Sequence, residues 1–125
     1  NVSELPQLWN EKMNESLGIT PPTDKEGVLQ DMHWSGGAIG YFPTYAIGTI
    51  YSAQLFNQLK KDHPETIDEI QKGEFNNILS WLRTNIHQYG RMMTAEEIMK
   101  KTCGQGLNAE EYTNYLSEKY LSMYS

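Results

Sequence analysis

The chain has 125 residues, a formal net charge of -6 and a single cysteine. That length suits one domain with a real hydrophobic core, and the acidic balance argues against non-specific binding to nucleic acid, which requires a basic surface. One cysteine excludes a disulfide within the chain. The sequence also has no run near the ~18 apolar residues of a membrane span and no signal peptide. These three observations predict a cytoplasmic protein without membrane contact.

Apolar residues at helical spacing predict two helices in the first half of the chain. The first covers residues 3–17, with Ser3 as its N-cap. The second follows Pro43, which suits a first helical turn because its φ is fixed and it has no N–H. Over residues 44–59 the apolar side chains wrap nearly the whole circumference, so we expect this helix to be the most buried one.

The second half of the chain predicts four further helices. They cover residues 65–71, 75–89 and 95–102, followed by a last helix that Asn108 caps. Thr94 and Glu97 form the capping-box pattern at the third of them. No strand-like alternation persists anywhere. The predicted fold class is therefore all-α, with five to six helices.

Residues 27–51, GVLQDMHWSGGAIGYFPTYAIGTIY, combine polar chemistry with backbone freedom as no other part of the chain does. Glycines carry no Cβ and allow another backbone or a ligand to approach closely. The stretch holds five, of which four follow the histidine: Gly36, Gly37, Gly40 and Gly48. This stretch predicts a polar loop that presents His33 and Trp34, then a glycine-rich turn, then a helix that begins with tyrosine.

His33 is the one histidine placed among other reactive groups. Histidine serves as general base, metal ligand or oxyanion partner because it titrates near neutrality, but it also occurs as a structural, hydrogen-bonded residue, and composition alone favours that second interpretation. Asp31 lies two residues earlier. In an extended segment its carboxylate would orient a ring N–H, and in another conformation it would cap a helix.

Tyr41 and Tyr45 are four residues apart, which places both on one helical face unless Pro43 distorts the turn. A phenol can stabilise an oxyanion, although tyrosines also fill half-buried helix faces, and the residues alone favour that role. Trp34 is better explained as a wall of a site than as a reactive group. No metal site is expected, because the chain has no HExxH, no cysteine pair and no histidine with an acidic partner at ligand spacing.

The octapeptide GVLQDMHW matches GxxQDxHW, a signature of the thermostable carboxypeptidase family, also called the Taq carboxypeptidase family of zinc metallopeptidases. The continuation SGGAIGYFPTYAIGTIYSAQLF, the opening LPQLWNEKMNESLGITPP and the ending EEYTNYLSEKY also resemble this family. The resemblance implies that residues 1–125 form a single helical fragment, the C-terminal portion of a larger metallopeptidase with a cleft.

Members of this family release single residues from peptide C-termini with a zinc ion held by HExxH and a downstream glutamate. The chain departs from that pattern, because HExxH, the third ligand and the HPF, DxRxT and IRxxAD motifs are missing. The resemblance therefore implies that zinc is bound outside this chain, that the fragment alone is inactive, and that its partners are peptide C-termini and the rest of the polypeptide. Surfaces meant for that remainder would be exposed and would favour association, including a homodimer.

A more distant similarity to thimet oligopeptidase and neurolysin implies roles for single residues. There, a histidine, a glycine pair and a tyrosine-rich helix start occur in the order of His33, Gly36-Gly37 and Tyr45. Tyr45 would be the oxyanion donor, with Tyr41 as the second choice, and His33 would donate a hydrogen bond to the substrate backbone or the intermediate. Gln30 and Asp31 would brace the loop or lie behind the metal ligands.

A second class of function also fits the residues, namely a free-standing helical module that binds peptides or another partner without catalysis. A start codon directly before Asn1 would favour this module, whereas an upstream HExxH in the same reading frame would favour the peptidase.

Overall fold

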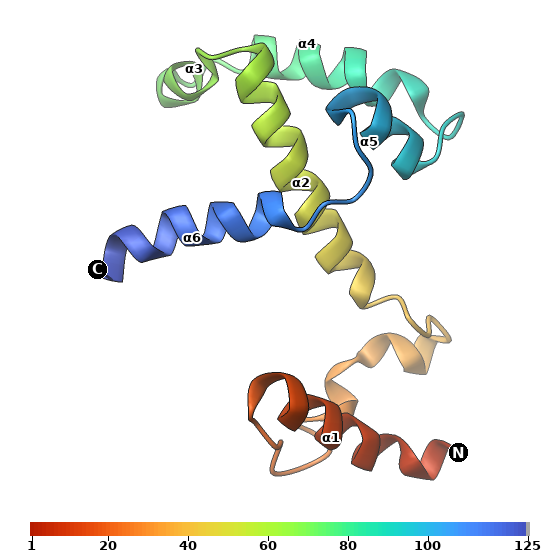
Figure 1. The fold of residues 1–125 in the computed structure, drawn as a ribbon. Coiled ribbons are helices and arrows are strands. Elements are labelled where there is room, and N and C mark those ends of the chain that lie inside the picture. The colour runs from red at the N-terminus through yellow and green to blue at the C-terminus, as the bar shows by residue number, and fades with distance from the viewer. Residues whose placement is uncertain (125) are drawn as a thin grey trace. The chain divides into compact units, whose positions relative to one another are not determined.

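The structure is a computed structural model that describes residues 1–124, and over that range it contains six α-helices, four short 3-10 segments and no strand. The predicted all-α class and helix number are therefore confirmed. Contacts divide the chain into two compact units, Asn1–Thr44 and Tyr45–Ser125, and Figure 1 labels the α-helices of both.

The first unit is built on α1 (Leu5–Leu17), preceded by the 3-10 turn η1 (Val2–Glu4). The predicted start at residue 3 is wrong, because Asn1, not Ser3, forms a capping box with Glu4 and winds the first residues into η1. Gly18 ends α1 with φ 68°, a conformation that glycine adopts readily.

Two further 3-10 segments, η2 (Val28–Gln30) and η3 (Met32–Gly36), follow a polar loop in the first unit. Trp34 and Trp9 of α1 form an edge-to-face pair, with the ring centroids 6.3 Å apart and the planes at 80°, an arrangement that aromatic pairs favour. Val28 is the buried apolar residue of η2. The first unit is thus a loop closed against one helix.

The second unit contains most of α2 (Pro43–Asp62) and the helices that follow it. These are α3 (Thr66–Lys72), α4 (Asn76–Asn85), the 3-10 turn η4 (His87–Tyr89), α5 (Ala95–Cys103) and α6 (Glu110–Tyr124). The predicted continuous helix over residues 75–89 is wrong beyond Asn85. The Asn85 carbonyl accepts a hydrogen bond from Thr102 Oγ1 at 3.2 Å, and the chain turns at Ile86 with φ -131°.

The core of the second unit lies where α2, α4 and α5 contribute Leu59, Trp81 and Met99, each at most 5% exposed. Trp81 Nε1 donates to Asp62 Oδ2 at 2.8 Å, which satisfies the one polar atom of the indole. Gln54 is 2% exposed. Its amide donates to the Gly106 carbonyl at 2.9 Å and accepts from the Asn108 backbone N–H at 2.9 Å. This side chain therefore fixes the connection between α5 and α6.

The N-terminal part of α2 is exposed throughout residues 43–49, contrary to the expectation that apolar residues all round would bury it. Tyr45 is 57% and Ile47 39% exposed. The helix α6 meets α2 further along, where Asn57 Nδ2 donates to Glu111 Oε2 at 2.6 Å. Burial in this helix consequently begins only in its second half, at Gln54 and Leu59.

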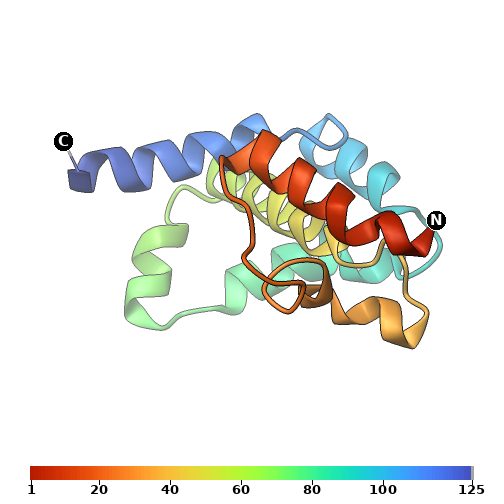
Figure 2. The ribbon, with the colours of Figure 1, turned by 90° about the horizontal axis from the view of Figure 1, so that it is seen from below.

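The C-terminal half of α6 extends away from the other helices of its unit in both views (Figure 1 and Figure 2). Leu121, Met123 and Tyr124 are accordingly 68%, 63% and 85% exposed. None of the helices in residues 1–124 has both the length and the apolar character that crossing a membrane requires.

Candidate functional site

The candidate site begins with a loop that the GxxQDxHW residues stabilise from within. A Cβ built at Gly27 would lie 3.1 Å from Pro21 Cβ and 3.3 Å from the Thr23 carbonyl oxygen, so a side chain at the first position of the motif would be crowded. Gln30 Nε2 donates to the Lys25 carbonyl at 2.6 Å. This bond joins the side chain of Gln30 to the backbone five residues earlier.

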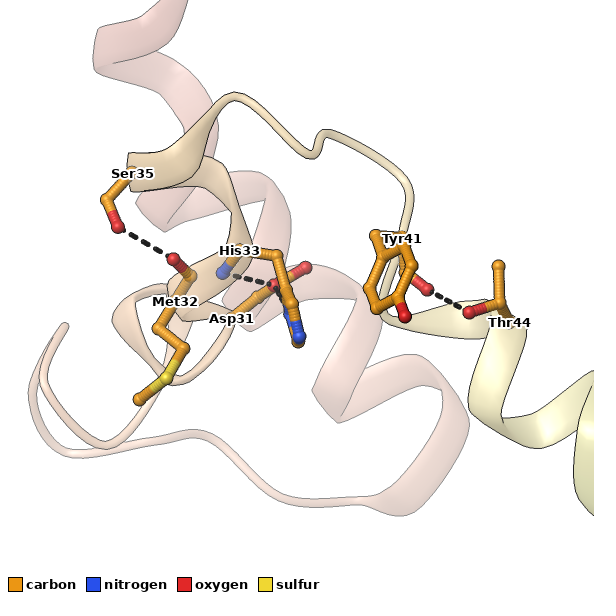
Figure 3. A network of polar contacts seen from close by, with 6 residues as sticks. All are labelled: Asp31, Met32, His33, Ser35, Tyr41 and Thr44. Atoms are coloured by element: carbon orange, nitrogen blue, oxygen red, sulfur yellow. Dashed lines mark hydrogen bonds and ion pairs between the residues drawn. The ribbon is translucent and has the colours of Figure 1, made fainter.

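Asp31 connects the loop to His33 through one oxygen atom (Figure 3). Its Oδ1 accepts from the backbone N–H of His33 at 3.2 Å and lies 2.8 Å from Nδ1 of the His33 ring. The sequence left a cap and a ring partner as alternatives, and the structure shows both. The side chains of Asp31 and His33 are 7% and 22% exposed, so the pair is largely shielded from water.

Aromatic side chains lie against the His33 ring. Its centroid is 5.0 Å from that of Tyr41 and 5.4 Å from that of Phe42, with planes tilted by 45° and 56°. Trp34 instead faces α1, where it helps to line an apolar groove of about 420 Å³ with Trp9 and Met13. Trp34 is thus a wall, although of this groove and not of the His33 surroundings.

The glycine pair after His33 serves two different purposes. Gly37 adopts φ 78° and ends η3, where its N–H donates to the carbonyls of His33 and Trp34. This left-handed conformation favours glycine. Gly36 has no positive φ, and a Cβ built on it would meet no atom within 4 Å. Its missing side chain leaves open space next to the histidine segment.

Tyr41 and Tyr45 do not share a helical face, because α2 begins only at Pro43. Tyr41 lies in the preceding turn, and its carbonyl accepts from Thr44 backbone N–H at 3.0 Å and from Thr44 Oγ1 at 2.7 Å (Figure 3). Tyr45 lies in the first turn of α2. The two side chains are 47% and 57% exposed.

The residues of this chain do not fit a zinc site. Within residues 1–124 no three His, Cys, Asp or Glu side chains are grouped so that they could hold a metal ion. Burial is the main cause that raises the pKa of the half-buried Cys103 thiol, with Glu111 adding to it, which disfavours the thiolate that metals bind.

Sequence reasoning missed two parts of this site. Gly27 was recognised as a motif position but not as the most crowded glycine, because its neighbour Pro21 is contributed by a loop whose path the sequence does not reveal. Sequence reasoning also assigned no contact with His33 to Phe42, whose ring the structure places beside that of His33. The proline-rich connection before the motif was the available signal for the crowding at Gly27.

Comparison with known proteins agrees with the resemblance seen in the motifs. The family model for carboxypeptidase Taq (M32) metallopeptidase matches residues 1–120. The chain is 47% identical over 120 residues to thermostable carboxypeptidase 1 of Pyrococcus furiosus, covering 96% of this chain and 24% of that protein. It is 45% identical over 124 residues to carboxypeptidase 1 of Bacillus subtilis, covering 99% and 25%.

Solved structures give the same result. Metallocarboxypeptidase 1 of Trypanosoma cruzi matches with a TM-score of 0.85 at 41% identity, over 96% of this chain and 26% of that one. A Pyrococcus furiosus carboxypeptidase matches with a TM-score of 0.88 at 45% identity, over 96% and 24%. The chain spans about a quarter of the length of these relatives. It belongs to the carboxypeptidase Taq (M32) metallopeptidase family.

Proposed function

We propose that this chain is the C-terminal part of a zinc metallocarboxypeptidase and forms one wall of the cleft in which single amino acids are released from peptide C-termini. Family membership over residues 1–120 supports the reaction class. The observation that carries the proposal for this part is the shielded Asp31–His33 pair inside GVLQDMHW, because a histidine that is oriented by a carboxylate can act on a substrate at a fixed position.

Two side chains have roles in the proposed reaction. Tyr45 donates a hydrogen bond from its phenol O–H to the oxygen that becomes negative when the scissile carbonyl is attacked. Its exposure allows it to reach a ligand. His33 donates a hydrogen bond to the substrate backbone or to the intermediate. Tyr41 is the second choice for the phenol role, since its ring is in contact with the His33 ring.

The neighbouring residues hold these groups in place. Gln30 and Asp31 brace the loop and the His33 ring, and Trp34 packs the histidine segment onto α1. Gly36 and Gly37 leave room for an extended peptide beside that segment, which the open space at a Gly36 Cβ supports.

In this proposal the remainder of the polypeptide supplies zinc and covers exposed apolar residues of α2 such as Ile47, while Tyr45 stays open to the substrate. Relatives are about four times as long as the chain, and residues 43–49 at the start of α2 are exposed although they include large apolar side chains. Such a surface favours burial against another part of the protein or against a second copy. The single cysteine supports the proposal that the protein works in the reducing cytoplasm.

Expression of this chain and of the full-length protein tests the proposal. The full-length protein should contain bound zinc by elemental analysis and shorten a peptide from its C-terminus one residue at a time, but leave an amidated peptide intact. This chain alone should do neither. Zinc in stoichiometric amount in the isolated chain, or peptide hydrolysis that survives repurification, would contradict its assigned inactivity, and a full-length protein that binds peptides without cleaving them would favour the binding module.

A further inference from the structure

We propose that Asp31 is a positioning residue that fixes the His33 ring with a hydrogen on Nδ1, so that Nε2 is the ring nitrogen that serves the substrate. The part of this inference that concerns catalysis rests on the function proposed above. Its structural part, the tautomer and orientation of the ring, stands independently of that function.

The chemistry of the two groups determines the direction of the hydrogen bond. An ionised carboxylate only accepts hydrogen bonds, so the 2.8 Å contact between Asp31 Oδ1 and His33 Nδ1 requires the hydrogen to be on Nδ1. A distance of 2.8 Å is typical of a strong, charge-assisted bond. In a neutral ring with this tautomer, Nε2 carries no hydrogen.

The consequence concerns the donor role of His33. Since Nδ1 is used by Asp31, a hydrogen bond donated to the substrate has to come from Nε2, and a ring that donates from both nitrogens is an imidazolium. The carboxylate then provides the counter-charge that a largely shielded cation needs. Asp31 thus selects the ring atom through which His33 acts.

Asp31 is more than a helix cap, although it is one. The same Oδ1 that accepts from the ring also accepts from the His33 backbone N–H at 3.2 Å, which closes a ring of bonds within three residues. Tyr41 and Phe42 lie against the imidazole at 5.0 and 5.4 Å and restrict its rotation. The ring is therefore fixed by an oxygen atom at one nitrogen and by aromatic contacts.

Two substitutions separate the cap from the ring contact. Asp31→Ser keeps a good N-cap but is too short to reach Nδ1. Asp31→Asn keeps the cap and a ring-facing oxygen but removes the charge. Asp24→Asn is the matched control, because it removes the same charge from an exposed residue of the same loop.

The tautomer is measured first, by ¹⁵N NMR of the histidine-labelled full-length protein with His33 assigned through His33→Gln. In the parent protein Nδ1 should have the chemical shift of a protonated nitrogen at every pH, and in Asp31→Ser this should be lost at high pH while Asp24→Asn behaves as the parent. An unprotonated Nδ1 in the parent protein would overturn the inference, whatever the role of His33 in catalysis.

Kinetics then connect the ring to the reaction. Asp31→Ser should lower kcat by about 10–100-fold, the usual effect of losing a partner that orients a histidine, with little change in KM, and adding it to His33→Gln should cause almost no further loss. Full activity in His33→Gln would refute the proposed role of His33 but not its tautomer. A loss in His33→Gln with full activity in Asp31→Ser and Asp31→Asn would overturn the positioning role.

Discussion

The His33 loop and the first two turns of α2 carry the two side chains proposed to act on the substrate, yet they are held in different ways. In the loop, His33 is fixed by residues within ten positions of it, through Asp31, Tyr41 and Phe42. In α2, residues 43–49 are exposed, and Tyr45 depends on a helix whose anchoring begins at Gln54.

The difference shows which parts of a site a short segment of chain can build alone. Hydrogen bonds within three to five residues form wherever the local backbone allows them, so the loop geometry is encoded locally. A helix that is apolar on all sides needs neighbours on all sides. Residues 43–49 at the start of α2 are exposed, which is consistent with a chain that spans about a quarter of its relatives' length.

The largest expected effect is the loss of the Tyr45 hydroxyl in the full-length enzyme. Tyr45→Phe should lower kcat by about 10²–10³-fold with a small change in KM, because an oxyanion donor acts mainly in the transition state. Steady-state kinetics on a short peptide measure both constants.

Tyr41→Phe is the matched control for Tyr45→Phe, since it removes a hydroxyl from a tyrosine next to His33. It should retain most of the activity. A collapsed rate for Tyr41→Phe with a normal rate for Tyr45→Phe would transfer the oxyanion role to Tyr41, and normal rates for both would leave only His33 as a catalytic candidate in this chain.

The second effect concerns the anchor of α2. Gln54→Ala should destabilise the protein by about 1–3 kcal/mol, because it leaves the part-buried Gly106 carbonyl and Asn108 N–H without their partner. Denaturant unfolding followed by circular dichroism measures the loss. Gln58→Ala is the control in the same helix, since its amide bonds only to Asp62 at an exposed position. Equal stability of both variants would show that the anchor contributes nothing.

The third effect tests how strictly the loop is built. Gly27→Ala should destabilise the protein by about 1–3 kcal/mol, the typical cost of forcing extra atoms into a packed site, because the added Cβ would press on a rigid proline ring at 3.1 Å and a backbone oxygen at 3.3 Å. Gly36→Ala should be close to neutral in stability, since it meets nothing within 4 Å. Thermal unfolding of the pair decides, and a neutral Gly27→Ala would refute the crowding.

Local signals predicted most of the helices and part of the site. The Thr94–Glu97 capping box was confirmed, because caps depend on residues within one turn. For the same reason the contact of Asp31 with the His33 ring was one of the two alternatives that the sequence left open. Each of these features is decided by neighbours in the sequence.

Features that depend on distant residues were missed. The end of α4 at Asn85 is set by Thr102, 17 residues away, and the burial of Gln54 by a loop 52 residues away. The apolar residues around Tyr45 predicted a buried helix, yet Tyr45 is exposed. Periodicity shows which helix faces are apolar, but not which other segments pack against them. The pairing of Gly27 with Pro21 likewise requires the path of the intervening loop.

The smallest effect is a change in stability whose sign should differ between this chain alone and the full-length enzyme. Gly48 lies inside α2, has no positive φ, and would place a Cβ where nothing lies within 4 Å. In this chain alone, Gly48→Ala should therefore raise helical stability by about 0.5–1 kcal/mol, the usual advantage of alanine over glycine in a helix, which circular dichroism and unfolding can measure. In the full-length enzyme the same change should destabilise, because the covering part of the protein would approach this point of α2 closely and meet the new methyl group. A stabilising effect in both proteins would show that α2 is uncovered at Gly48 in the complete enzyme, and a destabilising effect in both would show that this helix turn is already crowded within the chain.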